Sequence, residues 1–191
     1  MDQTVDLTLS GKKHSEPKSL HDIAKGSGPY PEAAFHFIRE GLEYAAHAVH
    51  GPLTPEQQIV TNYMAAERID FEALMEVYAR GDLDPTVTAA IDAAGGPKKI
   101  NRNVSGEDLC WALRDFARRR WGGLARLVLS RWHITRTEDF GNIVFALVEH
   151  QVMQKESHDT IEHFKNVYDF AEAFDGSFGF FDSAHDAAED D

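Results

Sequence analysis

Helix start and stop signals recur along this sequence. Residues 54–57 read Thr-Pro-Glu-Gln, in which the threonine can cap a helix, the proline fits its first position and the glutamine can reach back to the cap. Residues 105–108, Ser-Gly-Glu-Asp, form a second capping pattern. Gly81 and the Gly-Gly-Pro run at 95–97 are typical of helix ends. These signals predict a chain built mainly from helices.

Apolar residues between these signals repeat at intervals of three or four, which is the period of an amphipathic helix. We expect a short helix over residues 19–25, a long one over residues 31 to about 50, and further helices up to Arg80 and after Asp84. Three more follow, over residues 105–121, after Gly122-Gly123, and from a cap at Thr137. The residues expected to face the core are Ala34, Ile38, Leu42, Ala45, Val49, Leu109, Leu113, Phe116, Ala117, Leu124, Leu127, Val128, Trp132, Phe140, Ile143, Val144, Leu147 and Val148.

The apolar period changes after residue 150. Residues 152–155 and 164–170 have the pattern of short strands, and they flank a polar turn at 156–163. Three helices followed by a hairpin are typical of a winged-helix arrangement. The predicted fold is therefore mainly α, a compact helical domain with a winged-helix-like C-terminal half that ends in a small β-hairpin.

Composition sets the domain boundaries. Residues 1–18 are polar and lack periodicity, so we expect a disordered arm there. Residues 19–174 are expected to form a single helical domain, with 52–101 as a helical insertion. Residues 175–191 carry six acids and no base, which predicts an acidic disordered tail.

The same composition bears on the cellular compartment in which we expect the protein. No apolar run reaches the length of a membrane span, and the first 18 residues lack the apolar segment of a signal peptide. Cys110 is the single cysteine, which excludes an internal disulfide and a multi-cysteine zinc site. We therefore expect a cytoplasmic protein without a membrane anchor.

Charge is distributed unevenly along the chain, whose net charge is −13. Residues 98–136 hold ten of the nineteen lysines and arginines and only three acids. Such a basic region needs anionic groups, within the molecule or on a partner. The arginines that we expect to form the binding surface are Arg114, Arg118, Arg119, Arg126, Arg131 and Arg136.

Two readings of this arginine surface remain open. One is a non-enzymatic interaction module that binds a protein partner, with the acidic tail folding back on the arginines to modulate the contact. The alternative is binding of RNA or non-specific DNA through the same arginines, because guanidinium groups suit phosphates. Residues 138–150, which would enter the groove in a winged-helix protein, contain no lysine or arginine. That absence argues against sequence-specific duplex recognition.

Residues with possible catalytic or metal-binding chemistry have simpler explanations. The histidines and glutamates of the helix over residues 31–50 lie opposite its apolar stripe, which indicates a solvent-exposed face. The polar residues at 158–163 suit a turn, and Cys110 suits the core. No phosphate loop or HExxH motif is present, so we predict no catalytic residue, metal or cofactor, and an enzyme is the least favoured class. The residues concerned are His36, Glu40, Glu43, His47, His50, His158, Asp159, Glu162 and His163.

Two stretches carry a family resemblance. The first covers residues 20–45, including Tyr30-Pro31 and the run Phe-Ile-Arg-Glu at 37–40. The second covers residues 104–174, with the segments SGEDL, GLARLVL, RTEDFGNIVFALVE and VYDFAEAF. Together they resemble an uncharacterised conserved protein family of planctomycetes and verrucomicrobia. The resemblance implies a compact bacterial domain, with residues 52–101 inserted into the family pattern, and it implies no catalytic residues.

Overall fold

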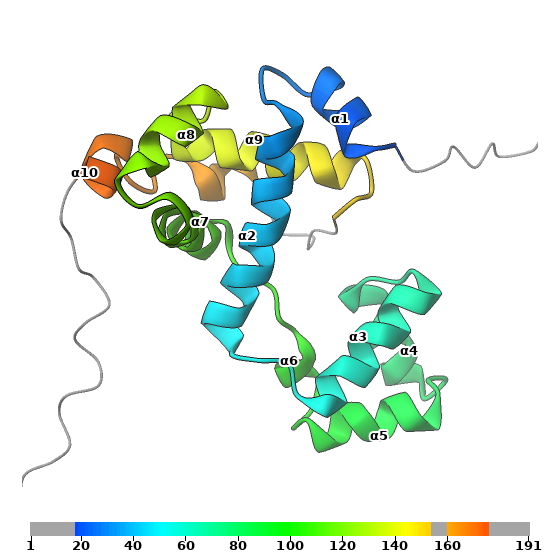
Figure 1. Ribbon diagram of the computed structural model, residues 1–191. Coiled ribbons are helices and arrows are strands. Elements are labelled where there is room, and N and C mark those ends of the chain that lie inside the picture. The colour runs from blue at the N-terminus through cyan, green and yellow to red at the C-terminus, as the bar shows by residue number, and fades with distance from the viewer. Residues whose placement is uncertain (1–17, 154–159, 176–191) are drawn as a thin grey trace, which may run out of the picture.

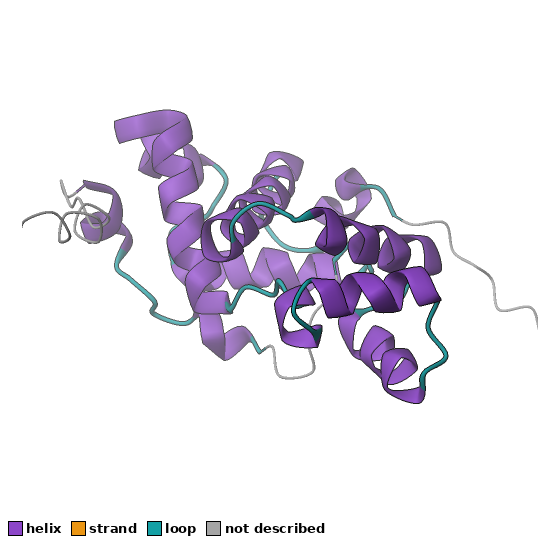
Figure 2. Cartoon of the chain, turned by 90° about the horizontal axis from the view of Figure 1, so that it is seen from below, coloured by secondary structure: helices purple, strands orange, loops and turns teal. Residues whose placement is uncertain are grey.

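The structure, a computed structural model, describes residues 18–153 and 160–175 (Figure 1). These residues are helical with connecting loops, and no strand occurs among them (Figure 2). The mainly α prediction is therefore confirmed. The elements are α1 (Leu20–Gly26), α2 (Glu32–His50), α3 (Pro55–Glu67), α4 (Phe71–Arg80), α5 (Pro85–Ala93), α6 (Pro97–Ile100), α7 (Gly106–Trp121), the 3-10 helix η1 (Gly122–Leu124), α8 (Ala125–Arg131), α9 (Thr137–Glu149), the 3-10 helix η2 (Ile161–Phe164) and α10 (Phe170–Asp175).

The predicted helix starts are formed by the expected side chains. Thr54 and Gln57 make both hydrogen bonds of a capping box at the start of α3. The Ser105 hydroxyl accepts a hydrogen bond from the backbone N–H of Asp108 at the start of α7. The cap of α9 differs from the prediction, because it is Arg136 rather than Thr137. Its capping carboxylate belongs to the third residue of the helix, Asp139.

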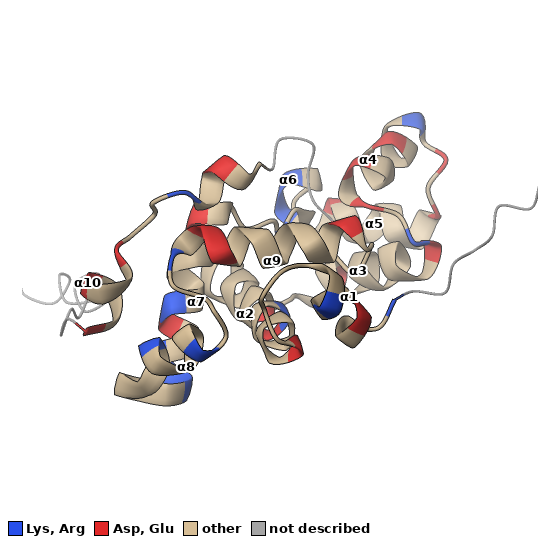
Figure 3. Ribbon diagram, turned by 90° about the horizontal axis from the view of Figure 1, so that it is seen from above, with Lys and Arg blue, Asp and Glu red and all other residues tan. Residues whose placement is uncertain are grey.

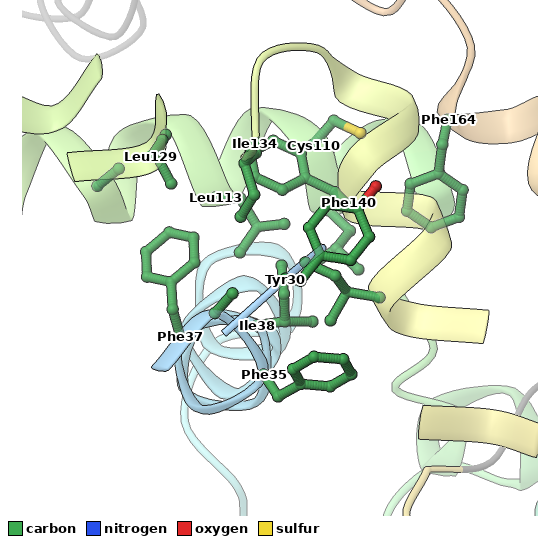
Figure 4. Packing of buried hydrophobic residues seen from close by; sticks show 14 of the residues in the cluster. Tyr30, Phe35, Phe37, Ile38, Cys110, Leu113, Leu129, Ile134, Phe140 and Phe164 are labelled. Atoms are coloured by element: carbon green, nitrogen blue, oxygen red, sulfur yellow. The ribbon is translucent and has the colours of Figure 1, made fainter. Parts of the chain in front are cut away.

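The main hydrophobic core surrounds α2, which contacts α1, α7 and α9. Phe35, Phe37 and Ile38 of α2 are buried against side chains of the other helices, including Leu113 and Phe140 (Figure 4). Helix α2 packs tightly against α7 at Gly41, where a Cβ atom would overlap the Leu113 side chain. A glycine here lets α2 and α7 cross at short range, and the burial of these large side chains is the main source of stability.

Helices α3 to α6 enclose a second, smaller hydrophobic cluster, which includes Val60, Leu74 and Ile91. In Figure 1 these helices form a group beyond the C-terminal end of α2. Arg102 joins this group to the end of α2. Its guanidinium donates hydrogen bonds to the backbone oxygens of Gly51 at 2.6 Å and Ala46 at 3.2 Å, and to Gln57 Oε1 at 3.3 Å.

The predicted C-terminal hairpin is wrong in the described residues. Residues 161–164 form η2, residues 165–169 form turns and residues 170–175 form α10, while Val152 and Met153 lie in a turn after α9. The reason is the burial of Phe164 against two glycines, Gly106 of α7 and Gly141 of α9, whose missing side chains leave room for its ring. The C-terminal half therefore lacks the wing of a winged helix among the residues described.

Three other predictions concern the chain ends and the membrane. The predicted disordered arm (1–18) and acidic tail (175–191) lie outside the described residues, apart from Lys18 and Asp175. Residues 154–159, which include the first half of the predicted turn, are also outside them. In the described part of the chain, no helix combines the length and apolar character that a membrane span requires.

Candidate interaction surface on helix α8

The basic residues of α7 and α8 gather at one end of the molecule (Figure 3). Their environments nevertheless differ from one arginine to the next. Arg114 is only 7 % exposed, so the expectation that it faces solvent is wrong. Its guanidinium donates to Asp115 Oδ1 at 2.6 and 2.8 Å and lies 4.6 Å from the Trp111 ring centroid. Residues after η2 cover this face of α7, where the Tyr168 ring lies 4.8 Å from that of Trp111.

Two further arginines contact α10. Arg118 donates a hydrogen bond at 3.1 Å to the backbone oxygen of Ala173, one of the carbonyl groups that a helix leaves without an intrahelical partner at its C-terminal end. Arg126 of α8 forms an ion pair with Asp175, the last residue of α10. The ion pair is half exposed, so it contributes little to stability. The two contacts hold the C-terminal end of the described chain beside α8.

The remaining predicted arginines are exposed. Arg119 and Arg131 form no ion pair with another described residue, and Arg136 lies 4.0 Å from Asp139 Oδ1 with 70 % of its side chain exposed. Arg120, which the prediction omitted, forms an ion pair with Glu40 of α2. The six predicted arginines therefore do not form one continuous free surface.

Two leucines are exposed beside the arginines of α8: Leu124, the last residue of η1, and Leu127 of α8. Leu124 is 62 % exposed and Leu127 is 55 % exposed, the highest values among the large hydrophobic residues described. Spacings of three and four place Leu124, Leu127 and Arg131 on one side of the helix. The expectation that the two leucines face the core is wrong.

The reason lies in the turn before α8. The 3-10 turn η1 carries the chain from Gly122 into α8, and the helix then buries Ala125 (1 % exposed) and Leu129 (0 %) instead. The small Ala125 lets α8 lie close to α7 and α10, which both contact it. We call Leu124, Arg126, Leu127 and Arg131 the α8 surface.

The histidines and acids considered as metal or catalytic candidates form no metal-binding cluster in the part of the chain that the structure describes. His36, Glu40, Glu43, His47 and His50 are all exposed, as the amphipathic pattern predicts. No cluster of three or more metal-ligating side chains occurs within residues 18–153 and 160–175. Of the turn candidates, Glu162 and His163 are exposed, and His158 and Asp159 lie outside the described residues.

Cys110 is completely buried in the main core. Burial raises the pKa of its thiol far above the usual range, and the nearby charges of Glu138 and Glu107 raise it further. The thiolate is the nucleophilic form of cysteine, so this thiol stays protonated and unreactive at neutral pH. Cys110 is a core residue, as the sequence indicates.

A cleft of about 550 Å³, which sequence analysis did not predict, lies between α4, α6 and the start of α7. Its lining includes the polar side chains of His50, Asp108 and His163 and the apolar side chains of Phe71 and Met75. The polar groups are engaged locally: His50 Nε2 lies 2.9 Å from the Asn103 oxygen, and Asp108 Oδ2 accepts a hydrogen bond from the Ser105 hydroxyl at 2.6 Å. The Ser105 hydroxyl is also the N-terminal cap of α7, so its pairing with Asp108 is explained by helix capping.

The α8 surface can therefore offer an apolar strip and guanidinium donors to the same ligand. Exposed leucines favour apolar contacts, and the arginines favour carboxylates or other anions next to them. In comparisons with known proteins, no protein-family profile, curated protein or solved structure matches the chain.

Proposed function

We propose that this protein is a non-enzymatic interaction module that binds a protein partner through the α8 surface. The partner presents apolar side chains next to carboxylates. The observation that carries this proposal is the exposure of Leu124 and Leu127 on the same side of α8 as Arg131. Full burial of an exposed leucine contributes about 1.5–3 kcal/mol, so these side chains, which are a little more than half exposed, would contribute about 1–2 kcal/mol each.

The same surface fits nucleic acid less well. Phosphate recognition depends on several free cationic groups along one face. Here Arg114 is buried against Asp115, Arg118 binds a backbone oxygen and Arg126 is paired with Asp175. Exposed leucines make no favourable contact with a phosphate backbone, whereas they contribute to the apolar centre of a protein interface.

The setting of the proposal is cytoplasmic. It is consistent with the presence of a single cysteine, because domains of oxidising compartments are commonly stabilised by disulfides. The resemblance of residues 20–45 and 104–174 to a bacterial family stays a prediction.

Fluorescence anisotropy with matched labelled peptides tests the proposed function. The first peptide alternates phenylalanine with aspartate, the second replaces each phenylalanine by serine, and the third replaces each aspartate by asparagine. The full-length chain is expected to bind the first peptide best. Leu127→Ser and Arg131→Ala are each expected to weaken that binding about tenfold, as interface residues that contribute about 1.4 kcal/mol do.

Ile59→Ser is the matched control, because Ile59 is 41 % exposed and belongs to α3, outside the α8 surface. Labelled single-stranded RNA and duplex DNA are titrated in parallel over a salt series. The proposal fails if the peptides do not bind, or if they bind equally to the wild type and the Leu127→Ser variant. Tight, steeply salt-dependent binding of RNA or DNA without peptide binding would establish the nucleic-acid alternative instead.

A further inference from the structure

The described chain ends beside the α8 surface. Phe174 of α10 is buried in the main core, and its ring centroid lies 5.1 Å from that of Phe170. The next residue, Asp175, forms the ion pair with Arg126, which belongs to the α8 surface itself. Residues 176–191 therefore start from a fixed point in contact with this surface.

The composition of residues 176–191 complements the α8 surface. The segment reads GSFGFFDSAHDAAEDD, with three phenylalanines followed by five acids and no lysine or arginine. The α8 surface offers two exposed leucines and the guanidinium group of Arg131, beside Arg126, which already pairs with Asp175. The segment and the surface thus each combine apolar side chains with charges, and the charges of the two are opposite in sign.

The other exposed large hydrophobic residues are less suitable as a binding site for residues 176–191. Val49, Leu53 and Ile59 are 41–49 % exposed, and they lie at the end of α2 and the start of α3. In Figure 1 this region is remote from α10. By contrast, α10 contacts α8 directly.

Length also permits the contact. Sixteen extended residues span about 50 Å, whereas α8 is only about 10 Å long. A tether this short gives the segment an effective concentration on the order of millimolar at a surface beside its attachment point. A weak interaction is therefore enough to occupy the surface much of the time.

We propose that residues 176–191 bind the α8 surface of their own chain and compete there with the partner. Phe178, Phe180 and Phe181 cover Leu124 and Leu127, and the acids that follow approach Arg131 and its neighbours. This inference rests on the proposed function, since it assigns a regulatory segment to the same surface. The protein would then bind its partner only when the partner displaces its own C-terminal segment.

Thiol labelling of the full-length chain tests the inference without a partner. Ser130 is exposed and lies on α8 three residues after Leu127, so Ser130→Cys places a reactive thiol there and keeps both leucines. The native Cys110 is buried and does not interfere. The labelling rate with the neutral reagent N-ethylmaleimide is compared between the wild-type tail and a tail with Phe178→Ser, Phe180→Ser and Phe181→Ser.

If the segment occupies the surface about nine-tenths of the time, labelling is about tenfold slower with the wild-type tail, because only the open fraction reacts. Asp82→Cys, at an exposed position of the α4–α5 loop, is the control and should label at the same rate with both tails. Equal rates at Ser130→Cys with the two tails would overturn the inference.

The acids are tested separately by replacing Asp182, Asp186, Glu189, Asp190 and Asp191 with their amides in the same full-length Ser130→Cys chain. This change should speed labelling at low salt and have less effect at high salt, because added salt already screens the charges. No change at low salt would exclude the acids from the contact. Labelling reports only on the tail, whereas the peptide titration in a chain with the serine-substituted tail reports only on the partner site. The two proposals can therefore fail independently.

Discussion

The Tyr30 hydroxyl donates a hydrogen bond of 2.8 Å to Asp139 Oδ1, and this contact joins residues 109 positions apart. The same hydroxyl accepts a hydrogen bond from Asn142 at 3.0 Å. The other oxygen of Asp139 accepts hydrogen bonds from the backbone N–H groups of Thr135 and Arg136 at the start of α9. Tyr30 therefore links the loop before α2 to the N-terminal cap of α9, and the contact is buried.

Tyr30→Phe is expected to reduce the free energy of unfolding by about 1.5–3 kcal/mol, as hydrogen bonds to charged groups do when they are lost. The phenyl ring keeps its apolar contacts, so the loss comes from the hydroxyl. Urea unfolding followed by tryptophan fluorescence measures the change. Tyr63→Phe serves as the control, because no described residue hydrogen-bonds the Tyr63 hydroxyl. An unchanged urea midpoint for Tyr30→Phe would show that the link does not contribute.

Gly141→Ala is expected to destabilise the protein by about 1–3 kcal/mol, as overpacking of a filled core does. The added methyl group would lie 2.8 Å from Phe164 Cγ and 2.9 Å from its Cβ, atoms close to the backbone that cannot move aside easily. Gly123→Ala is the matched control, since a Cβ atom there meets nothing within 4 Å. Thermal unfolding gives the melting temperatures of the two variants. Equal melting temperatures would refute the close packing of Phe164 against Gly141.

The helix boundaries were predictable because their causes are local. Thr54 and Ser105 each bond a backbone group only three residues away, so the signal lies within four letters of sequence. The position of Phe164 was not predictable in this way. It depends on Gly106 and Gly141, which come from two other helices. A residue pattern that fits a strand was therefore overridden by packing between distant segments.

The same distinction applies to the candidate surface. Residue counts along the sequence delimit the basic region, but they cannot decide which side of α8 is buried. Leu124 and Leu127 have helical spacing, and so do Ala125 and Leu129. The choice between the two sets is made by the packing of α8 on α7 and α10. Exposed leucines became visible only in the structure.

Arg102→Ala is expected to loosen the connection between α2 and helices α3 to α6. The variant leaves the backbone oxygens of Gly51 and Ala46 without their guanidinium donor. Hydrogen–deuterium exchange should become faster at the start of α3, while amides in the middle of α7 stay protected. Arg80→Ala is the control, because Arg80 is exposed and its ion pair with Asp82 is 3.5 Å long. The same exchange pattern in both variants would exclude this role for Arg102.

Stability should fall at alkaline pH, and Cys110 should account for the first part of the fall. Burial raises the pKa of its thiol above the ordinary value of 9.0, so the folded state keeps a proton that the unfolded state loses. This contribution is complete below about pH 9 and is lost progressively as the pH rises further. Cys110→Ala should therefore flatten the decline in the free energy of unfolding between about pH 9 and 10.

The measurement is urea unfolding at a series of pH values for the wild type and the variant. Burial also raises the pKa of the Tyr30 hydroxyl above its ordinary 10.0, which adds a further decline above about pH 10 in both proteins. Parallel curves between about pH 9 and 10 would show that the thiol does not titrate on unfolding.

Leu127→Ser and Leu129→Ser should separate the two sides of α8. Leu127 is 55 % exposed, so its substitution should change the free energy of unfolding by no more than about 0.5 kcal/mol. Leu129 is fully buried, and its substitution should cost about 2–5 kcal/mol. Urea unfolding of the two variants decides between this orientation of α8 and the one that the sequence suggested. A large loss of unfolding free energy for Leu127→Ser would show that this side of α8 is buried after all. A small loss means that the variant is folded, so that any weaker peptide binding by it reflects a missing contact.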